Sequence, residues 1–536
     1  MPDFVTSVFT PYLSWKTPDT SCFTVFVMNE IANLARIVTS RSLASLPILD
    51  LHGRQSNKEN QLVAALTKAP EATQLQVVKA LYGKATTTNV RALQKLQSRV
   101  RSKLLNQLYF LDHSDPRHLV SRRYELECLD LLHKVSILYA EREYKLSERL
   151  LLRCLRLAET GEFTQYVVQS ARMLRNLYAE QRQSIQYKKI TKVLLRAQQV
   201  LAWEDEAEQL HFDTQLTLSG TVAARRAVLA LLPDRIAQVK TLNQRARSFT
   251  TFNILYRLRL AYEEQQGNYQ EIIKATAAAS RRWRDGKLNA RRFDIRYNHL
   301  MSIYAYLRGR QSVQGLQLAE QYVRDFHQSS INWFYFEEHH VLLALHAQQY
   351  ERAQQLQLEI SKNPAYPMQR EAALQRWDLY KSYIDFVLPP QRVLTPRQRQ
   401  MAQWVLQLPE YSRDKRGHNV AILVLQVLYF LRERRLEEVL MRLESLRKYQ
   451  QRHLSEATTL RSRLFLRLLQ VIVEKNFDAA KAAVRGQTLL QQLKDTPPPG
   501  EAFTEVEIIP YEHLWALVLG LLRDGPPVAV VTEVAA

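Results

Sequence analysis

The stretch LRLAYEEQQGNYQEIIKATAAA, Leu258 to Ala279, decides the fold of this protein. Before Gly267 and after Tyr269, apolar residues recur every three or four positions, which is the period of an α-helix. Gly267 and Asn268 interrupt that pattern, and both residue types end helices because they readily adopt a left-handed backbone conformation. The stretch therefore predicts two helices joined by a very short turn, with Tyr269 opening the second helix.

This junction resembles the tetratricopeptide repeat, in which a helix, a glycine, an aspartate or asparagine and a tyrosine precede a second helix. The spacing from Ala261 to Gly267 is one residue longer than in that family. Weaker copies recur along the chain, where an aromatic or leucine residue would wedge between two helices and a small residue would let them cross closely. The residues predicted to form these junctions are Tyr144, Phe163, Gly267, Tyr269, Tyr350, Ala353, Leu436, Phe477 and Ala480.

The helical period runs from Asn60 to Leu522, and almost no stretch alternates with the period of two that strands require. We therefore predict an all-α fold, a superhelical array of antiparallel helix pairs similar to a tetratricopeptide solenoid, after a small N-terminal helical segment. An irregular helical domain without true repeats is the alternative. Within the array we expect separate helices over Gln186 to Ala202 and Glu204 to Ser219, and a further one over Pro396 to Gln407.

Composition shifts divide the chain into four parts: an irregular leader over residues 1–53, a basic helical segment over 54–118, the helical-repeat array over 119–523 and a flexible tail over 524–536. The first part is rich in Thr, Phe, Val and Pro and has almost no helical period, so Met28 is a candidate for the true start. Lys16 and Asp19 interrupt its apolar pattern, which argues against a secretory signal.

No membrane span is expected. The longest apolar runs, Val420 to Leu431 and His513 to Leu522, are well short of the roughly 20 residues that cross a bilayer. Cys22, Cys128 and Cys154 have neither CxxC spacing nor a histidine at a ligand offset, which argues against disulfides and zinc. A reducing cytoplasm is therefore the expected location.

The composition is unusual in charge and in glycine. The 536 residues carry a formal net charge of +21, which attracts nucleic acid, acidic proteins or anionic membrane surfaces. They include only 13 glycines, which predicts few tight turns and argues against loops that cradle phosphate.

A basic row is predicted on the helix over Asn89 to Leu111. Arg91, Lys95, Arg99 and Lys103 are four residues apart and therefore follow one face. The opposite face carries an apolar stripe of Val90, Leu93, Leu96, Val100, Leu104, Leu108 and Leu111. With two short helices before it, this helix resembles the recognition helix of a response-regulator winged helix, although no β-wing follows. Asn89 is expected to cap the helix. The row is either a phosphate-binding surface or an ordinary solvated face.

A second basic cluster lies in SRRWRDGKLNARRFDIRY, Ser280 to Tyr297. Aromatic residues interleave with arginines there, a mixture that can stack on bases and grip an RNA backbone. The alternative is a solvated connector whose aromatic side chains face the core. The arginines are Arg281, Arg282, Arg284, Arg291, Arg292 and Arg296.

Signals for catalysis, metal and cofactors are poor. The stretch NWFYFEEHHVLLALH contains Glu337, Glu338, His339, His340 and His346 but lacks the HExxH pattern of zinc proteases. No GxSxG, phosphate-binding loop or dinucleotide GxGxxG occurs in the sequence. We therefore expect no enzyme, and we name no catalytic, cofactor-binding or metal-binding residue.

The resemblance to tetratricopeptide proteins implies a non-enzymatic scaffold or adaptor that binds a protein or peptide partner in the groove of the solenoid. The basic composition favours an acidic partner. The alternative is a nucleic-acid-binding regulator that uses the Asn89 to Leu111 helix or the Arg281 to Arg296 cluster, with the solenoid as a sensor. The sequence makes no prediction of oligomeric state.

Overall fold

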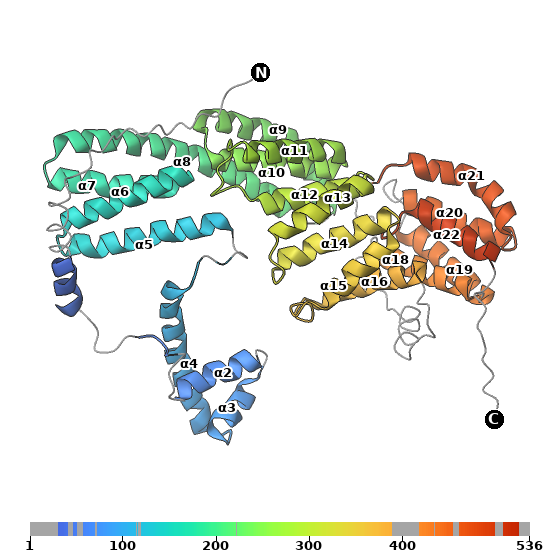
Figure 1. Cartoon of the computed structure of the whole chain (residues 1–536), viewed down its shortest axis with the longest axis horizontal. Coiled ribbons are helices and arrows are strands. Elements are labelled where there is room, and N and C mark those ends of the chain that lie inside the picture. The colour runs from blue at the N-terminus through green and yellow to red at the C-terminus, as the bar shows by residue number, and fades with distance from the viewer. Residues whose placement is uncertain are drawn as a thin grey trace. The chain divides into compact units, whose positions relative to one another are not determined.

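The structure is a computed structural model that describes residues 31–40, 47–50, 57–69, 72–113, 115, 119–220, 222–388, 418–433, 435–453, 460–498 and 507–524. Within these residues every regular element is a helix and no strand is formed, which confirms the predicted all-α class (Figure 1). None of the described helices combines the length and the apolar character that crossing a membrane would need. The predicted start at Met28, the predicted helix over 396–407 and residues 525–536 of the predicted tail lie outside the described residues.

The chain forms two compact units. Among the described residues, the smaller unit holds those up to 115 together with Leu126–Arg153. The larger unit holds Leu119–Glu125 and everything from Cys154 onward. The division therefore passes through the helices α5, Val120–Ala140, and α6, Tyr144–Gly161.

The smaller unit contains three helices packed against one another: α2, Lys58–Lys68, α3, Gln74–Tyr82, and α4, Thr87–Gln107, which continues into the short 3-10 helix η1, Leu108–Phe110. Side chains begin these helices by accepting backbone hydrogen bonds. Thr73 and Gln76 form a capping box at α3. The shared core consists of Leu49, Leu62, Val77, Val78, Leu93, Leu96 and Val100.

Two expectations for the N-terminal part are wrong. Residues 31–40 form a helix inside the stretch predicted to be irregular, because Ile37 packs with Leu138 and Leu146. The N-cap of α4 is Thr86 and not Asn89: the hydroxyl of Thr86 accepts from the Asn89 backbone N–H at 3.2 Å. Asn89 lies in the first turn, where its amide donates to the carbonyl of Lys84 at 2.8 Å.

The larger unit is a succession of helices, each packed against the next along the chain. Several also contact the next but one, as α8 contacts α10 and α12 contacts α14. In Figure 1, α14, α15, α16 and α18 follow one another side by side. The helices are α7, Thr164–Glu180, α8, Ser184–Leu218, α9, Val222–Ala246, α10, Phe249–Gln266, α11, Tyr269–Arg284, α12, Ile295–Arg308, α13, Ser312–Tyr322, η2, Val323–Asp325, α14, Ile331–His346, α15, Tyr350–Ser361, α16, Glu371–Val387, α18, His418–Arg432, α19, Leu436–His453, α20, Leu460–Glu474, α21, Ala479–Asp495, and α22, Tyr511–Asp524.

The two helices expected on either side of Trp203 are one helix, α8, of 35 residues. The expectation failed because the acidic residues after Trp203 look like a solvated break, yet the stretch contains neither glycine nor proline to end a helix. Glu204 is only 4% exposed, so the acidic run is partly buried inside a continuous helix.

One helix ending recurs through the described residues. At nine places a backbone N–H donates to the carbonyl five residues earlier, which is the bond that closes a Schellman turn. Each turn ends one helix and directs the chain into the next segment within a few residues. The bonds, at 2.8 to 3.0 Å, join Glu143 to Leu138, Phe163 to Ala158, Gln183 to Tyr178, Asn268 to Glu263, Lys287 to Arg282, Gln311 to Tyr306, Gln349 to Ala344, Arg435 to Phe430 and Phe477 to Ile472.

Most of these turns do without glycine. At the eight of these turns where the structure describes the residue before the donor, that residue adopts a positive φ, and among them glycine fills the position only at Gly267 and Gly286. Elsewhere it is filled by Arg142, Glu162, Arg182, Arg310, Gln348 and Asn476. The expectation that few glycines mean few tight turns is therefore wrong, because larger residues occupy the left-handed conformation here at some conformational cost.

Candidate functional site

The basic row of α4 is largely exposed. Arg91, Lys95 and Arg99 lie on the solvent side of the helix, opposite the buried Leu93, Leu96 and Val100. Lys103 differs from them, because its Nζ lies 2.7 Å from Oε2 of Glu59 on α2 and its side chain is only 32% exposed. Three of the four predicted cations are therefore available to an anionic partner, and the fourth ties α4 to α2.

The apolar stripe of α4 is buried only in its first half. Leu93, Leu96 and Val100 are in the core, but the predicted apolar stripe, which continues to Leu111, emerges into solvent after Val100, because the core shared with α2 and α3 ends there. The exposed residues beyond it are Leu104, Leu105, Leu108, Tyr109, Phe110 and Leu111, with Phe110 at 76%.

The Arg281 to Arg296 cluster does not form one exposed surface. Of the six arginines, only Arg281 and Arg284 are exposed. The guanidinium of Arg282 stacks over the Phe252 ring at 4.8 Å, and that of Arg291 stacks over Tyr124 at 4.7 Å. Arg296 pairs with Asp294 at 3.4 Å. Most of these arginines therefore contact the protein itself.

Arg292 is the most deeply engaged member of the cluster. Its guanidinium donates to the carbonyl of Glu162 at 2.6 Å, at the turn between α6 and α7, and lies 4.8 Å from the centre of the Phe163 ring. Burial lowers the pKa of Arg292, and the nearby carboxylate of Glu204 acts in the opposite direction. Burial also raises the pKa of Glu204, whose Oε1 accepts from the Thr164 hydroxyl at 3.0 Å. This arginine joins segments far apart in the sequence and is not free for a partner.

The predicted junction residues lie at or next to the starts of helices. Tyr144, Tyr269, Tyr350 and Leu436 are the first residues of α6, α11, α15 and α19. Gly267 ends α10 with a φ of 78°, and Phe163 and Phe477 are hydrogen-bond donors of the recurring turn. Ala353 is fully buried, whereas Ala480 is exposed.

The buried small residues on α21 are instead Ala482 and Gly486. A Cβ added at Gly486 would lie 2.9 Å from Leu468 and 3.0 Å from Trp515, so this glycine permits the close packing of α20, α21 and α22. Its position on the inner face of α21 was not among the predicted junctions.

Residues of three helices in the larger unit line an open hollow of about 600 Å³. Pro233 lies inside α9, where it removes one helical hydrogen bond. On α10 the hollow is lined by residues of opposite charge, Arg259 and Glu263, and on α11 by the ion pair of Lys274 and Glu271. The complete lining is Pro233, Ile236, Arg259, Leu260, Tyr262, Glu263, Glu271, Lys274 and Ala275.

The acidic and histidine-rich stretch of α14 is used in internal contacts. His340, 1% exposed, lies 3.1 Å from the carboxylate of Glu337. Glu338 accepts from Arg376 on α16 at 2.6 Å. Within the described residues no group of three His, Cys, Asp or Glu side chains is arranged to hold a metal ion.

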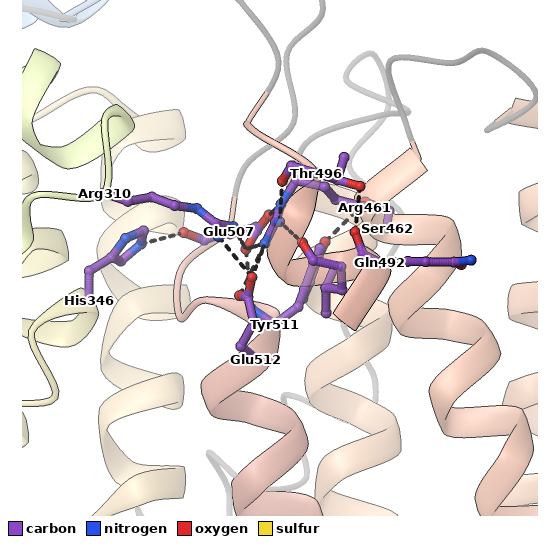
Figure 2. A network of polar contacts seen from close by, with 10 residues as sticks. Arg310, His346, Arg461, Ser462, Gln492, Thr496, Glu507, Tyr511 and Glu512 are labelled. Atoms are coloured by element: carbon purple, nitrogen blue, oxygen red, sulfur yellow. Dashed lines mark hydrogen bonds and ion pairs between the residues drawn. The ribbon is translucent and has the colours of Figure 1, made fainter. Parts of the chain in front are cut away.

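A buried arginine on α20 organises a polar network at the start of α22 (Figure 2). Arg461 is 1% exposed, and its guanidinium donates to the carboxylates of Glu507 and Glu512. Its Nη1 also donates to the carbonyls of Leu493, at 2.6 Å, and Thr496, at 2.7 Å, at the end of α21. Burial acts to lower the pKa of Arg461, but the two carboxylates outweigh it and raise the pKa.

The network extends to the earlier helices of the larger unit. Arg310, in the turn between α12 and α13, donates to Glu512 at 2.8 Å, so two arginines face two glutamates. The Nε2 of His346, at the end of α14, lies 2.8 Å from the carbonyl oxygen of Glu507 and must therefore carry the proton. Burial is the main cause that lowers the pKa of His346, to about 4, so this imidazole is neutral near neutral pH. Among the described residues, the network joins α20, the end of α21 and the start of α22 to Arg310 and His346.

The buried position of Arg461 was not predicted, although the spacing of residues on its helix indicates it. Arg461, Phe465, Leu468 and Ile472 follow the helical spacing of four, three and four, so the arginine continues an apolar stripe. A charged residue in such a position requires buried partners. Nothing in the sequence near α20 identifies those partners, because both glutamates come after α21.

A scan against protein-family models matched no family, and a search of curated proteins found no match. The described geometry offers two kinds of accessible surface, the exposed faces of the helices and the hollow lined by α9, α10 and α11. Within the described residues, several ionisable side chains of α14 and of the Arg461 network pair with one another, as His340 does with Glu337, Arg376 with Glu338 and Arg461 with Glu512.

Proposed function

We propose that this protein is a non-enzymatic, tetratricopeptide-like solenoid that acts as a scaffold or adaptor and binds a protein or peptide partner in its groove. The observation that carries the proposal is the recurrence of the same turn at nine places, with each helix packed on its neighbours along the chain. Repeated helix pairs of this kind create an extended binding surface from many similar faces.

The distribution of charge supports an acidic partner. Arg91, Lys95 and Arg99 leave their charges in solvent, and the larger unit adds exposed cations such as Arg281 and Arg284. Cations of one sign steer an oppositely charged partner during encounter and fix its orientation, more than they add to the final affinity.

The test is capture by the immobilised full chain from a nuclease-treated extract, followed by titration of each captured protein in purified form. A partner that binds stoichiometrically and saturably supports the proposal. If every captured protein is lost after nuclease treatment, or if none binds when purified, the adaptor function is wrong.

The second candidate, a nucleic-acid-binding regulator, is favoured by one observation. The three helices α2, α3 and α4 form a small unit whose last helix presents Arg91, Lys95 and Arg99 to solvent. Such a row would contact phosphates and make the affinity depend strongly on salt. Fluorescence anisotropy with labelled duplex DNA, single-stranded DNA and RNA at low and near-physiological salt, with these three residues changed to Glu, tests this candidate.

A further inference from the structure

The hollow between α9, α10 and α11 has an apolar floor. Pro233, Ile236 and Ala275 supply this apolar surface, whereas Leu260 is 1% exposed and offers almost none. The volume of about 600 Å³ falls within the range that binding sites for small ligands and side chains usually occupy. A bulky apolar side chain of a partner can therefore pack against this lining.

Four charged side chains line the hollow, and they differ in whether they have partners within the protein. Lys274 and Glu271 neutralise each other, with Nζ and Oε1 at 2.7 Å. Glu263 accepts a hydrogen bond from the Asn268 amide at 2.8 Å.

Arg259 lies on the same helix, four residues before Glu263, and is exposed. Throughout the part of the chain that the structure describes, it has no hydrogen-bond, ion-pair or ring partner. It is therefore the unsatisfied cation of the hollow.

An unsatisfied guanidinium beside an apolar floor is suited to a carboxylate next to an apolar side chain. Arginine can hold both oxygens of a carboxylate through parallel hydrogen bonds, which gives orientation as well as affinity.

We propose that this hollow is the site that binds a segment of the partner protein, with an acidic side chain on Arg259 and a neighbouring bulky apolar side chain against Ile236 and Pro233. The proposal rests on the adaptor function above and names the site and the chemistry of the bound segment.

The experiment measures fluorescence anisotropy of a short labelled peptide of alternating aspartate and leucine, titrated with the full-length protein at near-physiological salt. Arg259→Glu should weaken binding at least about tenfold, because a charge-assisted hydrogen bond is replaced by repulsion. Ala275→Trp should weaken it similarly by filling the floor without changing charge. The matched control is Arg485→Glu, an exposed arginine on α21, which should change the affinity less than about twofold.

Two results would overturn the assignment. One is equal weakening by Arg259→Glu and Arg485→Glu, which would show that only net charge matters. The other is equal affinity for a peptide that carries asparagine in place of aspartate. Circular dichroism and thermal unfolding of each variant establish that the fold is intact.

The site and the adaptor function can fail separately. If a captured partner binds the purified protein but is unaffected by Arg259→Glu and Ala275→Trp, the hollow is not its site and the adaptor function stands. If the peptide does not bind and no captured partner binds in purified form, both proposals are wrong.

Discussion

Arg461 on α20 and the basic row of α4 use the same kind of charge in opposite ways. Arg461 is 1% exposed and satisfied by two carboxylates and two carbonyls, whereas Arg91, Lys95 and Arg99 extend into solvent. The buried cation joins three helices, and the carboxylates of Glu507 and Glu512 offset its charge. The exposed cations contribute little to stability and are available to a partner. The net charge of +21 therefore includes both buried and exposed cations, and only the exposed cations are available to bind a partner.

The largest expected effect comes from breaking the buried network. Arg461→Met should lower the free energy of unfolding by about 3–5 kcal/mol, because two carboxylates and two carbonyls lose their donor inside the protein. Urea unfolding followed by circular dichroism measures the loss. Arg467→Met, an exposed arginine on the same helix, is the control and should change stability by less than about 0.5 kcal/mol. Equal effects of the two substitutions would remove the distinction between the two kinds of arginine.

The second largest effect is expected from acid, which should lower the free energy of unfolding through His346 in the buried network. The pKa of His346 is about 4 in the folded protein, against an ordinary value of 6.5. Between these two pH values the imidazole is therefore protonated in the unfolded chain and neutral in the folded chain. Stability is therefore lost as pH falls from 6.5 toward 4. At about pH 5 this one group should cost about 2 kcal/mol relative to about pH 7.5. Urea unfolding of native protein and His346→Gln at both pH values measures it, and the variant should lose correspondingly less stability in acid.

Lys103 should contribute to stability by an amount between that of the buried Arg461 and that of the exposed cations of α4. Lys103→Glu places a second carboxylate beside Glu59, at a contact that is partly shielded from water, and should destabilise the α2–α4 unit by about 1 kcal/mol. Glu59→Lys in the same chain should restore part of the loss. An unchanged free energy of unfolding in Lys103→Glu would place this lysine with the exposed cations.

The smallest expected effect on stability comes from the exposed row. Changing Arg91, Lys95 and Arg99 together to Glu should alter the free energy of unfolding by less than about 1 kcal/mol. The same change should abolish any nucleic-acid binding that depends on this row. Loss of stability comparable to that of Arg461→Met would contradict the assignment of these three residues to a free surface.

The helical period of the sequence was sufficient to predict the all-α class and most helices, because amphipathic stripes are local. It was insufficient at α8, where Glu204 looks like part of a solvated break but is buried close to Arg292. It was also insufficient after Val100, where an apolar stripe continues although the core ends. In both places the outcome depends on what packs against the helix, which a local pattern does not contain.

The candidate sites were harder to predict than the fold. Six arginines between Arg281 and Arg296 look equivalent in sequence, yet only Arg281 and Arg284 are exposed. The partners of the other arginines include Phe252 and Tyr124, which precede them by many residues. The hollow with Arg259 needs three helices to be placed together and therefore has no signature in any one of them.

The left-handed residues at the recurring turns bear on how such a chain can change over evolutionary time. Arg142, Arg182 and Gln348 hold a conformation that costs a side chain about 1 kcal/mol, and the turn forms all the same. The backbone hydrogen bonds thus define the turn, and many residue types can occupy its left-handed position. A chain built in this way can drift until its junctions no longer carry a glycine signature, while the helices still reverse direction at the same places.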